Sequence, residues 1–197
     1  GYLVVYSDIT QQKRTSTELQ KRFEAIQDAY KELGLQKRQL DYMSEIVDAA
    51  TSSTSLKSLQ QLIVSALCLL TRSDAVILRS TEENSLKLQA GFGVDKKWWN
   101  KGQIKTDNSL AMEAFKTGRP LIIDDIDQHP KHQSSQLLKS HRFKTLILLP
   151  LVYNKKLIGT ISLYSKDASK FRLIETDFLQ KMSRQCTLAL YAKSTLQ

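Results

Sequence analysis

The spacing of apolar residues changes along this chain, and that change limits the possible folds more than any other feature. Apolar side chains recur every three or four residues up to Leu70 and again after Leu173, whereas several segments from Ala75 to Tyr164 alternate apolar and polar residues. A period near 3.6 is typical of helices, and a period of two is typical of strands. The order of these segments predicts an α+β fold in which helices pack on a face of one antiparallel sheet.

A long helix is predicted to open the chain, and Asp8 or Thr10 can cap its first turn. Its apolar residues from position 19 are spaced by 4, 3, 4 and 3 residues: Leu19, Phe23, Ile26, Tyr30 and Leu33. This spacing is the a/d seam of a coiled coil, so we expect these five residues to form a homodimer interface.

The seam becomes less regular after Leu33. Lys37 falls on the next core position, and Gly34 weakens the helix by about 1 kcal/mol relative to alanine. We therefore expect a weak point near residues 34–38, which suits an element that switches between two states. The alternative is a single amphipathic helix that folds back on its own domain.

The rest of the chain divides into short elements separated by polar turns. Further helices are expected at 41–50, 56–72, 109–116, 134–141 and 173–194. Strands are expected at 1–6, 75–78, 86–90, 121–123, 145–152 and 157–164, with residues 94–108 irregular or weakly helical. Ser55 can cap the second helix, Gly118 can end the helix at 109–116, and Pro150 indicates a bulge or an edge in its strand.

Composition excludes several classes of protein. The net charge is +9, but the basic residues are scattered rather than clustered, so nucleic acid is not the expected partner. The chain has neither an apolar run of the ~18 residues needed to span a bilayer nor a secretory signal. Cys68 and Cys186 stand in apolar helical patterns, which is typical of buried thiols in a cytoplasmic protein. The first residue is Gly1, so we expect a segment of a longer protein.

Three pieces of the sequence resemble the GAF domain, which would cover roughly residues 40–195: "LAMEAFKTGRPLIIDDI", "DQHPKH" and "RFKTLILLPLVYNKKLIGTISLYSKD". The resemblance implies a regulatory domain whose first and last helices lie on one side of the sheet, often in a dimeric bundle. The other side would hold a small-molecule pocket roofed by short helices and loops. Such domains commonly precede histidine kinase, diguanylate cyclase, phosphodiesterase or activator modules of bacterial signalling proteins.

The N-terminal sequence "GYLVVYSDITQQKRTSTELQKR" is similar to the end of a PAS domain followed by a signalling helix, with Asp8, Ile9, Thr10 and Lys13 at the junction. The expected organisation is therefore a terminal PAS strand at 1–10, a coiled-coil linker at 11–40 and a GAF-like sensory domain at 41–197.

The candidate ligand-binding residues come from the sheet and from the segments expected to roof it: Phe92, Trp98, Trp99, Asp125, His129, Thr145, Thr160 and Ser162. Thr160 and Ser162 can form the floor of a pocket or can face solvent. The Trp98-Trp99 pair has two interpretations: either one ring fills the core while the other lies on the surface, or the pair is a lid that stacks on a planar ligand.

More specific functions of GAF-like domains find little support in the residues. The Asn-Lys signature of cyclic-nucleotide binding has no match, residues 126–144 contain no cysteine for bilin attachment, and both cysteines fall in helices rather than in the pocket that a methionine-sulfoxide reductase needs. The pair His129 and His132, with His141, is a weak metal pattern. We predict no catalytic residue and no metal, and the sequence identifies no cofactor.

The functional hypothesis is thus a small-molecule sensor that transmits through a dimeric helical linker. The alternative is a ligand-free dimerisation or spacer module. A cofactor-dependent enzyme is a third hypothesis, but no reacting group of residues supports it.

Overall fold

The structure is a computed structural model, and it describes residues 10–100, 103–107, 109–129, 140–172 and 174–195. It divides into two compact units, Gly1–Asp41 and Tyr42–Gln197. The strand expected at 1–6 and most of the helix expected at 134–141 lie outside the described residues. Among the described helices, none is both long enough and apolar enough to cross a membrane.

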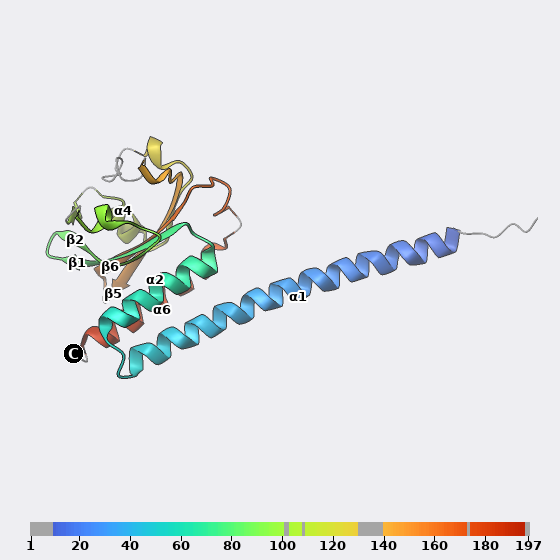
Figure 1. The fold of residues 1–197 in the computed structure, drawn as a ribbon, viewed down its shortest axis with the longest axis horizontal. Coiled ribbons are helices and arrows are strands. Elements are labelled where there is room, and N and C mark those ends of the chain that lie inside the picture. Colours follow the sequence, from blue (N-terminus) through green and yellow to red (C-terminus); the bar gives the residue numbers. More distant parts are fainter. Residues whose placement is uncertain (1–9, 101–102, 108, 130–139, 173, 196–197) are drawn as a thin grey trace, which may run out of the picture. The chain divides into compact units, whose positions relative to one another are not determined.

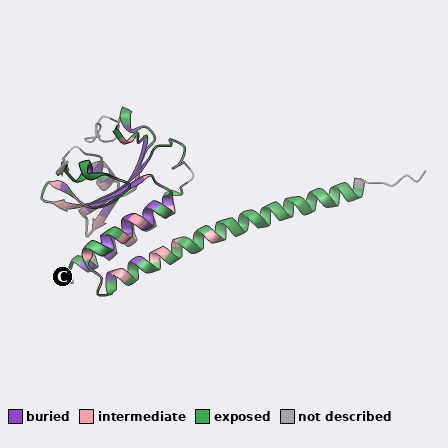
Figure 2. Ribbon diagram, in the orientation of Figure 1, coloured by how far each residue is buried: buried purple, intermediate pink, exposed green. Residues whose placement is uncertain are grey.

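The N-terminal helix, α1 (Thr10–Thr51), is 42 residues long and runs through Gly34 without a break. Most of its surface is exposed, and only its last turns are buried (Figure 2). The predicted long helix is therefore confirmed. The weak point expected near Gly34 stays a prediction, because the backbone there is helical like its neighbours.

The centre of the second unit is one antiparallel sheet with the strand order β3-β2-β1-β6-β5-β4. Its strands are β1 (Ala75–Glu82), β2 (Ser85–Phe92), β3 (Ile104–Lys105), β4 (Leu121–Ile123), β5 (Thr145–Tyr153) and β6 (Lys156–Ser165). The two middle strands, β1 and β6, pair in register from Ala75 opposite Tyr164 to Ser80 opposite Gly159. The α+β fold expected from the sequence is confirmed.

One face of the sheet is covered by α2 (Leu56–Thr71), α6 (Thr176–Thr195) and the last turns of α1. Figure 1 shows α2 and α6 side by side below the strands. Apolar side chains of these helices, such as Leu59, Ile63 and Met182, pack against Val76 and Leu149 of the sheet. We call this side of the sheet the helix face.

The opposite side, which we call the roofed face, is covered by shorter elements. These are α3 (Lys96–Asn100), α4 (Leu110–Thr117) and the 3-10 turn η1 (Ile126–Gln128). Its core is a second, smaller cluster of buried residues: Ala75, Ile77, Trp98, Leu110, Ala114, Ile123, Ile126, Phe143, Leu146, Leu148 and Tyr164. The sheet therefore separates two cores of different composition.

Local sequence determines where most elements begin and end. Ser55 accepts a hydrogen bond from Ser58 N and caps α2 as expected, and Ser109 accepts one from Met112 N and caps α4. Gly118 ends α4 in the left-handed conformation, at φ 63°. Asn154 and Lys155, both at positive φ, form the two-residue turn that joins β5 to β6. The register of β5 shifts between Leu151 and Val152, next to Pro150.

Candidate functional site

Strand alternation brings two sets of side chains together on the roofed face of the central strands. On β1, Ala75 and Ile77 belong to the roofed core, so Arg79 points to the same side. On β6, Tyr164 belongs to the same core, which places Ser162 and Thr160 on that side too. Arg79 lies directly opposite Thr160. The middle of the roofed face is therefore more polar than the helix face.

Arg79 is the unusual residue of this site, because its side chain is charged and only 5% exposed. The Tyr164 side chain is the group that interacts with it. No carboxylate pairs with it in the described part of the chain. Burial lowers the pKa of Arg79, and Tyr164 opposes that shift. A guanidinium remains protonated at neutral pH even so, and the site therefore carries a positive charge.

Arg79 was not among the residues predicted from the sequence, because the strand was expected to end at Leu78. The alternation Ala75, Ile77, Arg79 could have revealed it. A residue in this position shares a face with two fully buried side chains, although its own burial depends on the elements that cover the sheet. β1 in fact continues to Glu82.

Trp98 fills the core beneath the roof and is 2% exposed. Its ring lies 5.8 Å from His141, 6.4 Å from Phe143 and 5.6 Å from Tyr164, centroid to centroid. Trp99 is 48% exposed. Of the two interpretations of this pair, the structure fits the one in which one ring fills the core and the other lies on the surface.

Two polar atoms on this side of the sheet are buried without a hydrogen-bond partner among the described residues. They are Nε1 of Trp98 and Oγ1 of Thr81, which is two residues beyond Arg79 on the same strand. An unsatisfied buried donor costs about 1–3 kcal/mol. Such atoms are therefore expected where a water molecule or a ligand completes the hydrogen bonding.

The remaining predicted residues lie apart from this group. Phe92 lies opposite Val76, and Thr145 is two residues before Ile147 on β5. Val76 and Ile147 belong to the core on the helix face, so Phe92 and Thr145 point to that face. Asp125 caps η1 by accepting hydrogen bonds from Asp127 N and Gln128 Nε2, each at 3.0 Å. His129 follows that turn, and its Nδ1 is buried without a partner in the described part. Only Trp98, Thr160 and Ser162 of the predicted set accompany Arg79.

The two cysteines lie in the core on the helix face rather than near Arg79. Burial raises the pKa of Cys186 to about 12. Burial, and then the nearby Asp74 carboxylate, also raises the pKa of Cys68. Both thiols are therefore protonated at neutral pH and are poor nucleophiles. Among the described residues, no three His, Cys, Asp or Glu side chains are grouped to hold a metal ion; His132 lies outside them.

Comparison with known proteins agrees with this architecture. The sequence model of the GAF domain family matches residues 53–190, which is more than half of the chain. A search of curated proteins finds no match.

Several solved structures share the fold at low sequence identity. The GAF domain of a phosphoenolpyruvate-protein phosphotransferase from Coxiella burnetii is 17% identical, with a TM-score of 0.64, and the match covers 81% of this chain and 93% of that one. Free methionine-R-sulfoxide reductase from Neisseria meningitidis is 16% identical, with a TM-score of 0.66 and coverages of 81% and 92%. Residues 122 to 287 of a methyl-accepting chemotaxis protein are 17% identical, with a TM-score of 0.61 and coverages of 79% and 98%. At these identities the likeness establishes the fold.

Proposed function

Because the chain belongs to the GAF domain family, we propose that it is the small-molecule-sensing domain of a multidomain signal-transduction protein. The observation that carries this proposal is the contrast between the two faces of the sheet. On the two central strands, β1 and β6, the residues that belong to the core under the helices are apolar: Val76, Leu78, Ile161 and Leu163. On the roofed side the same strands bury Arg79, Thr160 and Ser162, and burial of such groups has a cost unless a partner hydrogen-bonds to them.

The role is regulatory rather than catalytic. The fold is also that of a methionine-sulfoxide reductase, but the protonated thiols of Cys68 and Cys186 lie on the other side of the sheet from Arg79. The sensor acts in the cytoplasm, where such thiols stay reduced. Residues 1–10 form the end of a preceding PAS domain, 11–40 the linker and 41–197 the sensory domain.

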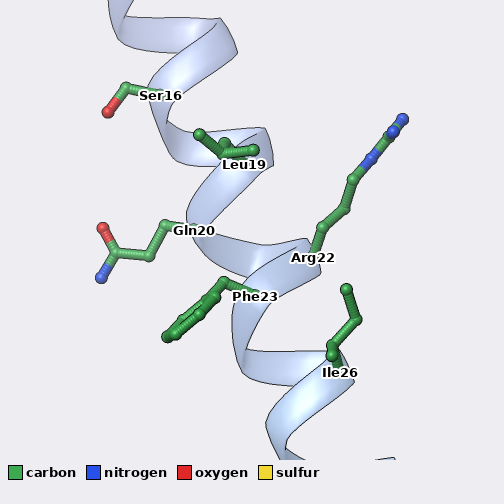
Figure 3. A pocket seen from close by; sticks show the side chains of 6 residues that line it. All are labelled: Ser16, Leu19, Gln20, Arg22, Phe23 and Ile26. Atoms are coloured by element: carbon green, nitrogen blue, oxygen red, sulfur yellow. The ribbon is translucent and has the colours of Figure 1, made fainter.

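Transmission runs through α1 as a parallel homodimer. The seam residues Leu19, Phe23, Ile26, Tyr30 and Leu33 are between 53% and 71% exposed. Figure 3 shows Leu19, Phe23 and Ile26 on successive turns, where they line a surface hollow of about 500 Å³ together with Ser16, Gln20 and Arg22. Large apolar side chains in this regular arrangement favour a second helix that covers them.

Native mass spectrometry of freshly purified protein tests the sensing role. We expect a small molecule that stays bound to the folded chain and is released on denaturation. A protein that carries no added mass, and whose Trp98 environment shows no change with any metabolite extract, would contradict sensing and favour a ligand-free dimerisation module.

Cysteine cross-linking tests the linker. We expect Phe23→Cys and Ile26→Cys to form disulfide-linked dimers on mild oxidation, because both positions face the seam. Ala25→Cys is the matched control, since position 25 lies away from the seam on the same turn of α1. Equal cross-linking at all three positions, or none at high protein concentration, would refute the coiled coil.

A further inference from the structure

We propose that the roofed face binds a small organic carboxylate whose anionic group pairs with the buried Arg79 guanidinium. This inference rests on the proposed sensing function and adds the chemical class of the ligand. Three features support it: the charge of Arg79, the hydrogen-bond donors near it and its apolar neighbours.

Among the residues that the structure describes, no carboxylate balances the charge of Arg79. Within the described ranges, the buried charged residues are Arg79 and Lys193, and no aspartate or glutamate is buried. Lys193 is accounted for, because its ammonium donates to the carbonyl of Ser52, just beyond the C-terminal end of α1. Among the described residues, the Tyr164 side chain is the group that interacts with Arg79. Buried charges are normally paired, so a bound anion would supply the partner that the described residues do not.

The groups around Arg79 can donate hydrogen bonds to such an anion. Thr160 lies directly across from Arg79, and Thr81 lies two residues along the same face. Tyr164, which interacts with Arg79, lies 5.6 Å from Trp98, ring centroid to ring centroid. Trp98 Nε1 lacks a partner among the described residues. Thr81 Oγ1 lacks one too, but Thr81 lies on the opposite side of Arg79 from Tyr164 along the strands. An indole N–H can only donate, so the unsatisfied group calls for an acceptor.

One cation beside apolar neighbours favours a monocarboxylate over a phosphate. The planar guanidinium matches a carboxylate with two parallel hydrogen bonds, and a single positive charge balances a single negative one. Leu88, opposite Arg79 on β2, and Ile77 on the same face of β1 are apolar. An apolar environment of this kind suits the organic part of a carboxylate better than a fully hydrated inorganic ion. A phosphate dianion would require a second cation, and no other buried cation lies on the roofed face among the described residues.

The test measures the thermal unfolding of the whole chain in the presence of the sodium salts of acetate, pyruvate, butyrate, benzoate and indole-3-acetate. Sodium phosphate is tested separately, and all solutions have the same ionic strength. At about 10 mM, we expect at least one carboxylate to raise Tm by about 5 °C. Arg79→Met keeps the apolar volume of the side chain and removes its charge, so it should abolish that shift. Arg79→Lys keeps the charge but loses the planar fork, so it should reduce the shift. Arg184→Met, which removes an exposed arginine on α6, should keep it.

The stability of the unliganded variants separates a binding role from a structural one. If Arg79 awaits a ligand, Arg79→Met without added carboxylate should melt at or above the wild-type Tm, because an unpaired buried charge has been removed. An Arg79→Met protein that fails to fold or melts several degrees lower would overturn the proposal. So would a wild-type protein that no carboxylate stabilises, or one that phosphate stabilises more. A neutral or cationic molecule found by native mass spectrometry would overturn the carboxylate but leave the sensing role intact.

Discussion

At the scale of single residues, Asp74, which lies between α2 and β1, is bonded to residues at the C-terminal end of β6. Its carboxylate accepts hydrogen bonds from Lys166 N at 2.8 Å and Ser165 Oγ at 3.0 Å, and Lys170 Nζ lies 3.7 Å away. Partial burial alone would raise the pKa of Asp74, but these partners together outweigh it and lower the pKa below its ordinary value. We expect Asp74→Asn to lower the free energy of unfolding at pH 7 by about 1–2 kcal/mol.

The pH dependence of that loss follows from the direction of the shift. A carboxyl whose folded pKa lies below its unfolded value stabilises the fold above the unfolded value, and this contribution disappears as pH falls through the folded pKa. Wild type and Asp74→Asn should therefore differ in urea unfolding at pH 7, and by less at pH 3. Asp107→Asn, at an exposed position, is the control and should match wild type throughout. A constant difference at both pH values would contradict the assignment.

Gly159 stands where the backbones of β6 and β1 approach closely. A Cβ at this position would lie 2.3 Å from the carbonyl oxygen of Arg79. We expect Gly159→Ala to force the central strands apart and to cost about 2–4 kcal/mol in urea unfolding. Gly34→Ala is the contrasting variant, because a Cβ there has no neighbour within 4 Å. That substitution should be neutral or should stabilise α1 by up to about 1 kcal/mol. Equal effects of the two substitutions would disprove this steric explanation.

At the scale of elements, Lys193 ties the last turn of α6 to the junction after α1. Its Nζ donates to the carbonyl of Ser52 at 2.5 Å, and the residue is only 5% exposed. Lys193→Met should lose this charge-assisted hydrogen bond and about 1–3 kcal/mol of stability. The matched control is Lys181→Met on the same helix, where the ion pair with Asp177 is exposed and contributes little. Guanidinium unfolding that ranks the two variants equally would show that the contact to Ser52 is not stabilising.

The elements also show how far the sequence predicts this structure. Helix caps at Ser55, Ser109 and Gly118 depend on local chemistry, so they could be predicted. The two-residue strand β3 could not, because it has no periodicity and exists through pairing with Ser85 and Leu86. The strand β2 was difficult to predict for a third reason, a shift in its register. Its register with β1 shifts after Leu78, leaving Gln89 as an extra residue. Leu88 therefore faces the roof, whereas Phe92 faces the helices, which simple alternation cannot reveal.

The sequence predicted only part of the candidate site, because alternation along a strand shows which face a residue occupies but not what covers that face. Thr160 and Ser162 follow a strand whose alternation is regular, and the structure places them beside Arg79 on the roofed face. Arg79 itself was missed because a charged residue in a sequence suggests a solvated end of a strand. Its burial depends on the roof formed by α3 and α4, whose packing over the sheet is tertiary information.

At the scale of the whole molecule, the two units make separable contributions. Removal of residues 1–41 should leave the second unit folded, because its core includes Ile46 and Ala50 from the part of α1 that remains. We expect Tm to change by less than about 3 °C. Self-association, measured by analytical ultracentrifugation, should weaken by more than about tenfold, which corresponds to about 1.4 kcal/mol.

Phe23→Lys in the full chain is the companion variant, because it places a charge in the seam without shortening the protein. It should weaken self-association to a similar degree. If the truncated protein and Phe23→Lys associate as tightly as wild type, the dimer contacts lie in the second unit and the seam is not the linker.

The contact between Lys193 and Ser52 connects the last turn of α6 directly to the residue that follows α1. These residues are 141 positions apart along the chain, yet one hydrogen bond joins them. If α1 transmits a signal as we propose, a rotation of α1 can reach α6 by two routes: through the sheet and the site around Arg79, or directly through the hydrogen bond between Ser52 and Lys193. A ligand that stiffened the sheet would then change how much of the rotation passes through the direct contact.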